Sequence, residues 1–222
     1  MTTFIMGAPM EQVSRHQCLI YAGPPSRHLA ALAVTLRAKL WRNYRCLYLN
    51  SPSMVAGIRS FLAAADVDVE EEIARGSLVL SAEQGHLVDG QFDVRRMLET
   101  LDGALAQALH DGYAGLWATG DMTWEMGPQR DSSKLLDYEW HLEEFMRKHP
   151  EMSGICQYHA DTLPREMLRH GLLAHRSIFV NETLSLINPQ YLRPESVTDV
   201  AANTIEINAA LDQLCELNGA AD

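Results

Sequence analysis

A chain of 222 residues can bury the core of one α/β domain without disulfides, whereas two independent domains would be cramped. With 47% hydrophobic and 21% charged residues the composition is typical of a soluble globular protein, and no apolar run approaches the roughly 18 residues of a membrane span. The formal net charge of −11 at pH 7 opposes contact with nucleic-acid phosphates, so no direct nucleic-acid binding and no membrane segment are expected.

The amino terminus and the cysteines indicate a cytoplasmic protein. The first residues lack a basic stretch followed by a long apolar one, so no secretion signal is predicted. The four cysteines lie far apart and form no C-x-x-C pair, which is typical of reduced thiols. We expect them to be small buried hydrophobic residues.

Strand-like and helix-like segments alternate along the chain, which is the pattern of a sheet covered by helices on both faces. Short apolar runs predict strands at residues 17–21, 45–50, 77–81, 115–118 and 154–158, with one or two more at 177–180 and 184–187. Helical spacing of apolar residues predicts helices at 29–41, 54–64, 93–110 and 135–148, and an acidic segment covers 66–72. This order predicts a three-layer α/β sandwich with a mainly parallel central sheet.

The end of the chain predicts one further helix. Beyond Pro194 the apolar residues recur at alternating spacings of three and four, interrupted by Thr204. An isolated helix of this length is marginal, so it must pack on something. Docking on its own domain is favoured slightly over a homodimer through this helix or a connector to a partner. We therefore divide the chain into an N-terminal extension (1–15), a main domain (16–193) and a C-terminal helical tail (194–222).

Ligands of open parallel sheets bind beyond the carboxyl ends of the strands, which directs attention to the loops at 22–28, 50–54, 82–86, 119–124 and 159–164. The first of these loops, extended by one residue to 22–29, reads AGPPSRHL. It stands where a nucleotide hydrolase would have the loop that holds the phosphates. Its one glycine, its two prolines without N–H groups and its lack of a lysine make efficient nucleotide hydrolysis improbable. Ser26 is expected to cap the next helix, and Arg27 or His28 to offer anion contacts.

The segment GLWATGDMTWEM at 115–126 brings a carboxylate to the same edge. Asp121 takes the place of a metal-holding acid, but that role needs a phosphate loop. We interpret Asp121 as a polar group in an apolar pocket, with Trp124 as a wall and Thr119 as a hydrogen-bond partner. An aspartate that only fixes the turn after Gly120 is an equally good interpretation.

Two other groups of polar residues have spacings that chemistry could use. His16-x-Cys18 and Cys156-x-x-His159 together carry zinc-ligand atoms, but His16 precedes the first strand and His159 follows the fifth, a separation of about 15 Å or more in a parallel sheet. Glu139 and Glu143 share a helix face, where a solvated acidic surface is favoured over acid–base chemistry. The sequence thus predicts no metal and no cofactor, and it favours a role other than that of an enzyme.

A set of short motifs resembles the MEDS family, a sensory domain named for methanogens, methylotrophs and the regulator DcmR. The motifs are HQCLIY (16–21), GQFD (90–93), GDMTW (120–124), LLDYEWHL (135–142), GICQYHAD (154–161) and NPQY (188–191). They follow the order of the family over about residues 16–193. The resemblance implies a RecA/KaiC-like P-loop fold that lacks a functional Walker A loop.

The resemblance also implies signalling. Family members are proposed to sense small organic molecules such as hydrocarbon derivatives, in front of a histidine kinase, an anti-sigma-factor module or a DNA-binding domain. Only the helical tail follows residue 193 here, so the signal is expected to pass to a separate partner of such a kind, including a transcription regulator, or to a second subunit. Asp121 and His159 stand where the family more often has glutamate and aspartate, which indicates a different ligand.

The leading prediction is a cytoplasmic sensory domain that binds a small organic ligand above the carboxyl edge of its sheet. The predicted ligand-binding residues are Tyr21, Ser26, Arg27, Asn50, Thr119, Asp121, Trp124, Tyr158 and His159. Two alternatives stay open: a nucleotide-binding protein or weak NTPase of the RecA/KaiC type, and a protein-interaction module that binds no ligand.

Overall fold

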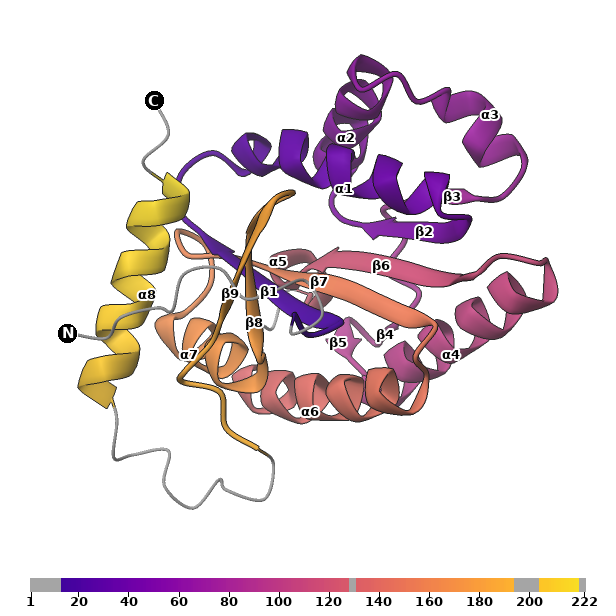
Figure 1. The fold of residues 1–222 in the computed structure, drawn as a ribbon. Helices are drawn as coiled ribbons and strands as arrows, with labels where there is room; N and C mark the ends of the chain where they lie inside the picture. Colours follow the sequence, from indigo (N-terminus) through magenta and orange to yellow (C-terminus); the bar gives the residue numbers. More distant parts are fainter. Residues whose placement is uncertain (1–12, 128–130, 194–203, 220–222) are drawn as a thin grey trace.

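The computed structural model describes residues 13–127, 131–193 and 204–219, and its centre is a seven-stranded sheet in the order β3-β2-β6-β7-β1-β8-β9 (Figure 1). Neighbouring strands are parallel except β8 and β9. The strands of this sheet are β1 (His16–Tyr21), β2 (Tyr44–Leu49), β3 (Leu78–Ser81), β6 (Gly115–Asp121), β7 (Met152–His159), β8 (Ser177–Asn181) and β9 (Leu184–Ile187). A separate small hairpin pairs β4 (Leu87–Val88) with β5 (Gln91–Phe92).

Helices cover both faces of the sheet, as Figure 1 shows. One layer contains α1 (Leu29–Trp41), α2 (Pro52–Ala64) and α3 (Val69–Ala74). The other contains α4 (Val94–His110), α6 (Ser132–Lys148), α7 (Arg165–Ala174) and α8 (Thr204–Gly219). Two short elements, the 3-10 turn η2 (Pro25–His28) and α5 (Met122–Glu125), follow β1 and β6. The predicted α/β sandwich with a mainly parallel sheet and a C-terminal helix is confirmed.

Strand residues alternate between two hydrophobic cores, because successive side chains of a strand point to opposite faces. In β1, Leu19 and Tyr21 join the core under α1 and α2, whereas Cys18 and Ile20 join the core under α4, α6, α7 and α8. Strands buried on both faces read as continuous apolar runs, which is why β1 and β2 were recognisable in the sequence.

The predicted strands and long helices match the observed ones to within a few residues, but α3, α7 and the β4–β5 hairpin were not predicted. Helix α3 is capped by Asp68, whose side chain accepts a hydrogen bond from the Glu71 N–H at 3.1 Å. In α7 the buried Met167, Leu168 and Leu172 alternate with charged residues over only ten positions. Such a short pattern gives a weak signal compared with tertiary packing.

The interpretation of Glu139 and Glu143 as a solvated acidic face is wrong. Glu139 is fully buried and the side chain of Glu143 is 18% exposed. Glu139 lies on the same face of α6 as the buried Tyr138 and Leu142, so it points to the sheet. This carboxylate is therefore part of the interior between α6, α7 and the sheet.

Helix α8 packs on its own domain. Its buried residues Ile207, Leu211 and Leu214 join the core beside α7 and β1, and the Asn218 side chain donates a hydrogen bond to the Ile20 carbonyl at 2.7 Å. Residues 194–203, which carry the first part of the predicted apolar stripe, lie outside the described residues. The described part of the tail thus adopts the arrangement that the sequence favoured.

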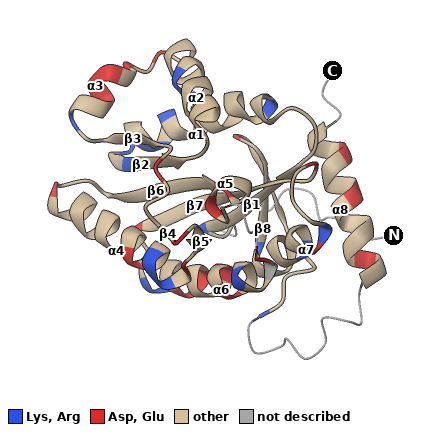
Figure 2. Ribbon diagram, turned by 180° about the vertical axis from the view of Figure 1, so that it is seen from behind, with Lys and Arg blue, Asp and Glu red and all other residues tan. Residues whose placement is uncertain are grey.

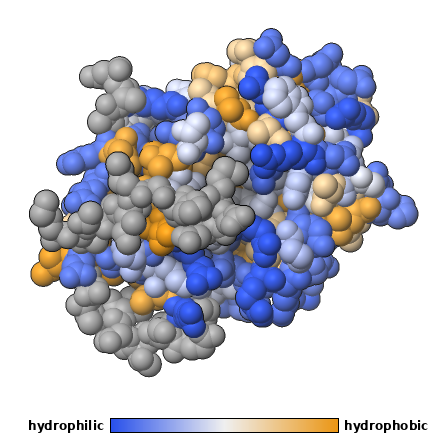
Figure 3. Space-filling model, in the orientation of Figure 1, coloured by the Kyte–Doolittle hydropathy of each residue, from blue (hydrophilic) through white to orange (hydrophobic). Residues whose placement is uncertain are grey.

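Charged and apolar side chains are distributed over the surface without one dominant patch in the views shown. Acidic positions occur along α3 and α8, while acidic and basic positions mix along α4 and α6 (Figure 2). Figure 3 shows hydrophobic positions in small separate groups on one face, and exposed large apolar side chains such as Trp41, Phe61 and Leu109 belong to different helices. Every helix in the described ranges is too short or too polar to cross a lipid bilayer.

The closeness of β7 to β6 gives a first testable prediction. A Cβ on Gly154 would run into the backbone carbonyl oxygen of Ala118, so Gly154→Ala should lower the free energy of unfolding by about 1–3 kcal/mol. Gly103, on an exposed position of α4, has nothing within 4 Å of an added Cβ, and Gly103→Ala should raise that free energy by about 0.5–1 kcal/mol. Urea denaturation measures both, and equal losses in the two variants would contradict the packing argument.

The docking of α8 gives a second prediction. Leu211 is fully buried, so Leu211→Ala should cost about 2–5 kcal/mol of unfolding free energy. Ile205, on the same helix, is 86% exposed, and Ile205→Ala should change it by less than about 0.5 kcal/mol. Chemical denaturation of the two variants separates them, and an unaffected Leu211→Ala would show that α8 is not part of the core in solution.

Candidate functional site

A hollow of about 450 Å³ opens at the carboxyl edge of the sheet. Its size lies within the usual range for small-molecule sites, about 300–1,000 Å³. Four of the predicted ligand-binding residues line it, from the ends of three strands and the turns behind them: Asn50 after β2, Asp121 and Trp124 at and after the end of β6, and His159 at the end of β7. Other residues of its wall were not among the predicted ligand-binding residues, including Ser51, Met54, Gln84, Thr123 and Thr162.

Asp121 ends β6 and turns the chain into α5. Its Oδ1 accepts a hydrogen bond from the Trp124 N–H at 3.0 Å, and its Oδ2 lies 3.5 Å from the Tyr21 hydroxyl. Burial raises the pKa of Asp121, which the Trp124 N–H and the nearby His159 oppose. Asp121 thus fixes the turn, as one interpretation predicted, and also lines the hollow.

His159 ends β7, the strand next to β6, and also lines the hollow. Its Nε2 donates to the carbonyl of Gly23 at 2.8 Å, and its Nδ1 lies 3.1 Å from the Thr162 hydroxyl. The Tyr21 ring stacks on the His159 ring with centroids 4.9 Å apart. The predicted residue Tyr21 therefore supports the site from beneath by holding His159 and reaching Asp121.

The aromatic wall is held by the loop that follows β3. Gln84 donates through Nε2 to the Trp124 carbonyl at 2.6 Å, and the His86 ring lies 5.2 Å from the Trp124 ring. His86 also reaches the Glu125 carbonyl through Nε2 at 2.9 Å. Gln84 and His86, both in the loop after β3, thus hold the backbone at Trp124 and Glu125 and pack beside the Trp124 ring.

The structure does not bring Thr119 and Tyr158 to the hollow. The Thr119 hydroxyl donates to the Ile155 carbonyl at 2.7 Å inside the sheet. Tyr158 directly precedes His159 in β7, so the two side chains point to opposite faces of the sheet. Tyr158 faces α6, where its hydroxyl donates a hydrogen bond to Glu139.

The 3-10 turn after β1 also differs from expectation. The prediction that Ser26 caps a helix is wrong, because Pro24 and Pro25 already start a 3-10 turn and Ser26 lies within it, exposed. Arg27 donates to the carbonyl of Gly219 in α8. The N–H of Gly23 donates to the Asp161 carboxylate at 2.8 Å, so a carboxylate occupies the donor that a phosphate loop would offer to a nucleotide.

Two larger hollows, of about 580 and 670 Å³, lie elsewhere. The first is between α1 and the β8–β9 hairpin, and the second is beside His16 and Glu143 at the amino end of β1. We assign the ligand site to the carboxyl edge because polar groups from separate strands converge there, as in other open parallel sheets.

Glu125 is buried behind the hollow with an unusual environment. It is 2% exposed, and its Oε2 has no hydrogen bond to any residue in the ranges that the structure describes. Burial raises its pKa well above the usual value, and Glu139 and Asp121 add to the rise. A carboxyl group with these surroundings stays protonated in the fold at pH values where the unfolded chain has lost the proton.

This difference predicts a pH-dependent effect of Glu125→Gln. Because unfolding releases the Glu125 proton above pH about 4.5, wild-type stability loses up to about 1.4 kcal/mol per pH unit until the folded pKa is passed. Glutamine does not titrate, so the variant lacks this pH-dependent loss of stability. The difference in unfolding free energy, variant minus wild type, should therefore rise between pH 4 and pH 8. Urea titrations at several pH values test this, and a constant difference would contradict it.

Comparison with known proteins identifies the family. The family model described as "MEthanogen/methylotroph, DcmR Sensory domain" matches residues 15–176, most of the chain. A search among curated proteins found no match to this chain. The chain belongs to the MEDS family of sensory domains, as the motifs predicted; the likeness to RecA- and KaiC-type ATPases stays a prediction.

Proposed function

We propose that this member of the MEDS family is a cytoplasmic sensory domain that binds a small organic ligand in the hollow at the carboxyl edge of its sheet. Family membership gives the sensory role. The observation that carries the ligand-binding proposal is the convergence of Asn50, Asp121, Trp124 and His159 around one hollow of about 450 Å³.

The lining favours a ligand with a small apolar body and one or two polar groups. Trp124 and Met54 offer apolar surface, while Asp121 and Asn50 offer hydrogen-bonding groups. A ligand that donates a hydrogen bond fits the Asp121 carboxylate best, because that group lines the hollow, is nine-tenths buried, and has a long contact of 3.5 Å between its Oδ2 and the Tyr21 hydroxyl.

A route from this hollow to α8 passes through the loop after β1. Pro25 lines the hollow, Arg27 donates to the Gly219 carbonyl, and Asn218 donates to Ile20. A ligand that moves this loop changes the contacts at the carboxyl end of α8. We propose that a partner, such as a histidine kinase, an anti-sigma factor, a transcription regulator or a second copy of the chain, reads that change.

The alternative of a nucleotide-binding protein is less well supported. The Gly23 N–H is already bonded to Asp161, and Pro24 and Pro25 supply no further donors. A nucleotide would have to displace the Asp161 carboxylate and would find few amides in return. The interaction module without a ligand leaves the convergent polar lining unexplained.

A thermal-shift screen tests the proposal. The panel contains short-chain alcohols, aldehydes and methylated amines, together with ATP and Mg²⁺. A ligand at a hundredfold excess over its Kd adds about 2.7 kcal/mol, which corresponds to roughly 5–10 °C for a chain of this size. Asp121→Asn and Trp124→Ala should each lose most of that shift, measured relative to the melting temperature of the same variant.

Matched controls separate binding from stability. Asp121→Asn keeps an oxygen that can accept from the Trp124 N–H, so the α5 turn should persist. Trp41→Ala removes a tryptophan that is 74% exposed on α1 and should keep the full shift. Shifts that persist in both site variants would place the ligand elsewhere, and a shift with ATP and phosphate release that depends on Asp121 would favour the nucleotide alternative.

A further inference from the structure

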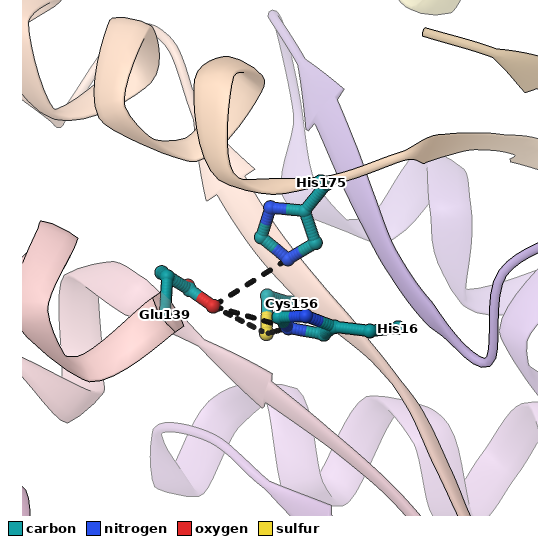
Figure 4. Close-up of side chains that lie close together, drawn as sticks. All are labelled: His16, Glu139, Cys156 and His175. Carbon is teal, nitrogen blue, oxygen red and sulfur yellow. Dashed lines mark hydrogen bonds and ion pairs between the residues drawn. The ribbon is translucent and has the colours of Figure 1, made fainter. Parts of the chain in front are cut away.

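A second cluster of reactive side chains lies inside the domain, between the sheet and helices α6 and α7. His16, Glu139, Cys156 and His175 each offer one ligand atom, and these atoms all lie within 4.8 Å of one another (Figure 4). His16 comes from β1, Glu139 from α6, Cys156 from β7, and His175 follows α7. All four residues are buried, with exposures of 1%, 0%, 5% and 0%.

The separations between these atoms suit a tetrahedral metal ion. Glu139 Oε2 lies 3.1 Å from His16 Nε2, 3.5 Å from His175 Nε2 and 3.6 Å from Cys156 Sγ, and Cys156 Sγ lies 3.5 Å from His16 Nε2. Zinc binds nitrogen, oxygen and sulfur at about 2.0–2.3 Å, so neighbouring ligand atoms in a tetrahedron lie about 3.3–3.8 Å apart.

Outer contacts orient both imidazoles toward the centre of the cluster. His16 Nδ1 lies 3.0 Å from the Glu143 carboxylate, and His175 Nδ1 lies 2.7 Å from the Gly171 carbonyl. Both partners are acceptors, so both rings carry a proton on Nδ1 and turn Nε2 inward. The second oxygen of Glu139 accepts from the Tyr158 hydroxyl. Metal-binding histidines typically have such a carboxylate or carbonyl behind the ring.

One atom of the cluster is left without a hydrogen bond. His175 Nε2 is buried and has no hydrogen-bond partner among the described residues, and the lone pair of a ring protonated on Nδ1 faces the Glu139 carboxylate. An ion pair between a protonated His16 and the two glutamates would satisfy those three groups but not His175. A cation at the centre satisfies all four ligand atoms at once.

An ion also has a route to this place. The hollow of about 670 Å³ at the amino end of β1 is lined by His16 and Glu143, and the side chain of Glu143 is partly exposed. A cation entering from there meets the Glu143 carboxylate first and then the buried cluster behind the His16 ring.

We propose that His16, Glu139, Cys156 and His175 bind one Zn²⁺ ion per chain. Two imidazoles, a thiolate and a carboxylate are ligands that zinc accepts in a four-coordinate site. Because all four positions belong to protein side chains that are buried, the site is of the closed, structural kind. The ion joins β1 and β7 to α6 and to the end of α7, and the Cys156 thiol loses its proton when the ion binds.

This proposal replaces the prediction of no metal that the sequence suggested. The separation of His16 from His159 was predicted correctly, since the register pairs His16 with Gly154 and Tyr21 with His159. The site uses Glu139 and His175 instead of His159, and it stands apart from the proposed ligand hollow.

Metal analysis of the full chain tests the proposal. The full chain is purified under reducing conditions from zinc-supplemented cells. Its metal content, measured by inductively coupled plasma mass spectrometry, should be one zinc ion per molecule. Chelation should lower the melting temperature, and Zn²⁺ should restore it. Chain reloaded with Co²⁺ should show a thiolate-to-cobalt charge-transfer band and the intense visible bands of tetrahedral cobalt. If the wild-type chain binds neither Zn²⁺ nor Co²⁺, the proposal is overturned, and this outcome needs no mutant for its interpretation.

Variants then locate the site. Cys156→Ala should abolish the charge-transfer band, whereas Cys18→Ala, its buried neighbour in register on β1, should keep it. Glu143→Gln, which removes only the charge behind His16, should weaken Co²⁺ binding about 10–100-fold while circular dichroism stays unchanged. A band that survives in Cys156→Ala, or is lost equally in Cys18→Ala, would overturn the assignment.

Discussion

The parallel pairing of β1 with β7 is the contact on which both sites depend. Its register places Tyr21 beside His159 at the carboxyl edge and Cys18 beside Cys156 in the interior. Because side chains alternate between faces, a slip of one residue would move Tyr21 and His159 out of step and turn Cys156 away from Glu139. Two buried faces make such a slip costly, so one strand pair fixes the geometry of the hollow and of the buried cluster together.

Three carboxylates inside the domain show how the fold accommodates charge away from water. Asp121 is compensated by the Trp124 N–H and Glu139 by Tyr158 and His16, whereas one oxygen of Glu125 has no hydrogen bond to the described residues. Burying an ionised carboxylate costs many kcal/mol unless partners replace the water. Glu125 therefore stays neutral, Asp121 serves a polar pocket, and Glu139 retains a charge that an ion or a histidine can share.

Most of the fold was predictable from the sequence, because buried parallel strands such as β1 and long amphipathic helices such as α4 have strong local patterns. Helix α7 was not, since it is short and its burial is decided by contacts with α6 and α8. The pocket residues Asp121 and His159 follow from their places at strand ends. Tyr158 could have been excluded, because it alternates with His159. His175 carried no signal, since it follows an unpredicted helix.

Under the proposed function, α8 is the element that transmits the signal of ligand binding from the domain to a partner. Its middle is held by buried leucines, each worth about 2–5 kcal/mol, whereas its carboxyl end is held by side-chain hydrogen bonds from Arg27 and Asn218, each worth about 0.5–3 kcal/mol. A ligand shifts an equilibrium only by its difference in affinity for the two states, and allosteric coupling is typically 1–3 kcal/mol. That energy matches the contacts at the carboxyl end of α8 and falls short of releasing the helix. The output expected of this domain is therefore a local rearrangement beside the loop after β1, with the leucines of α8 still in the core.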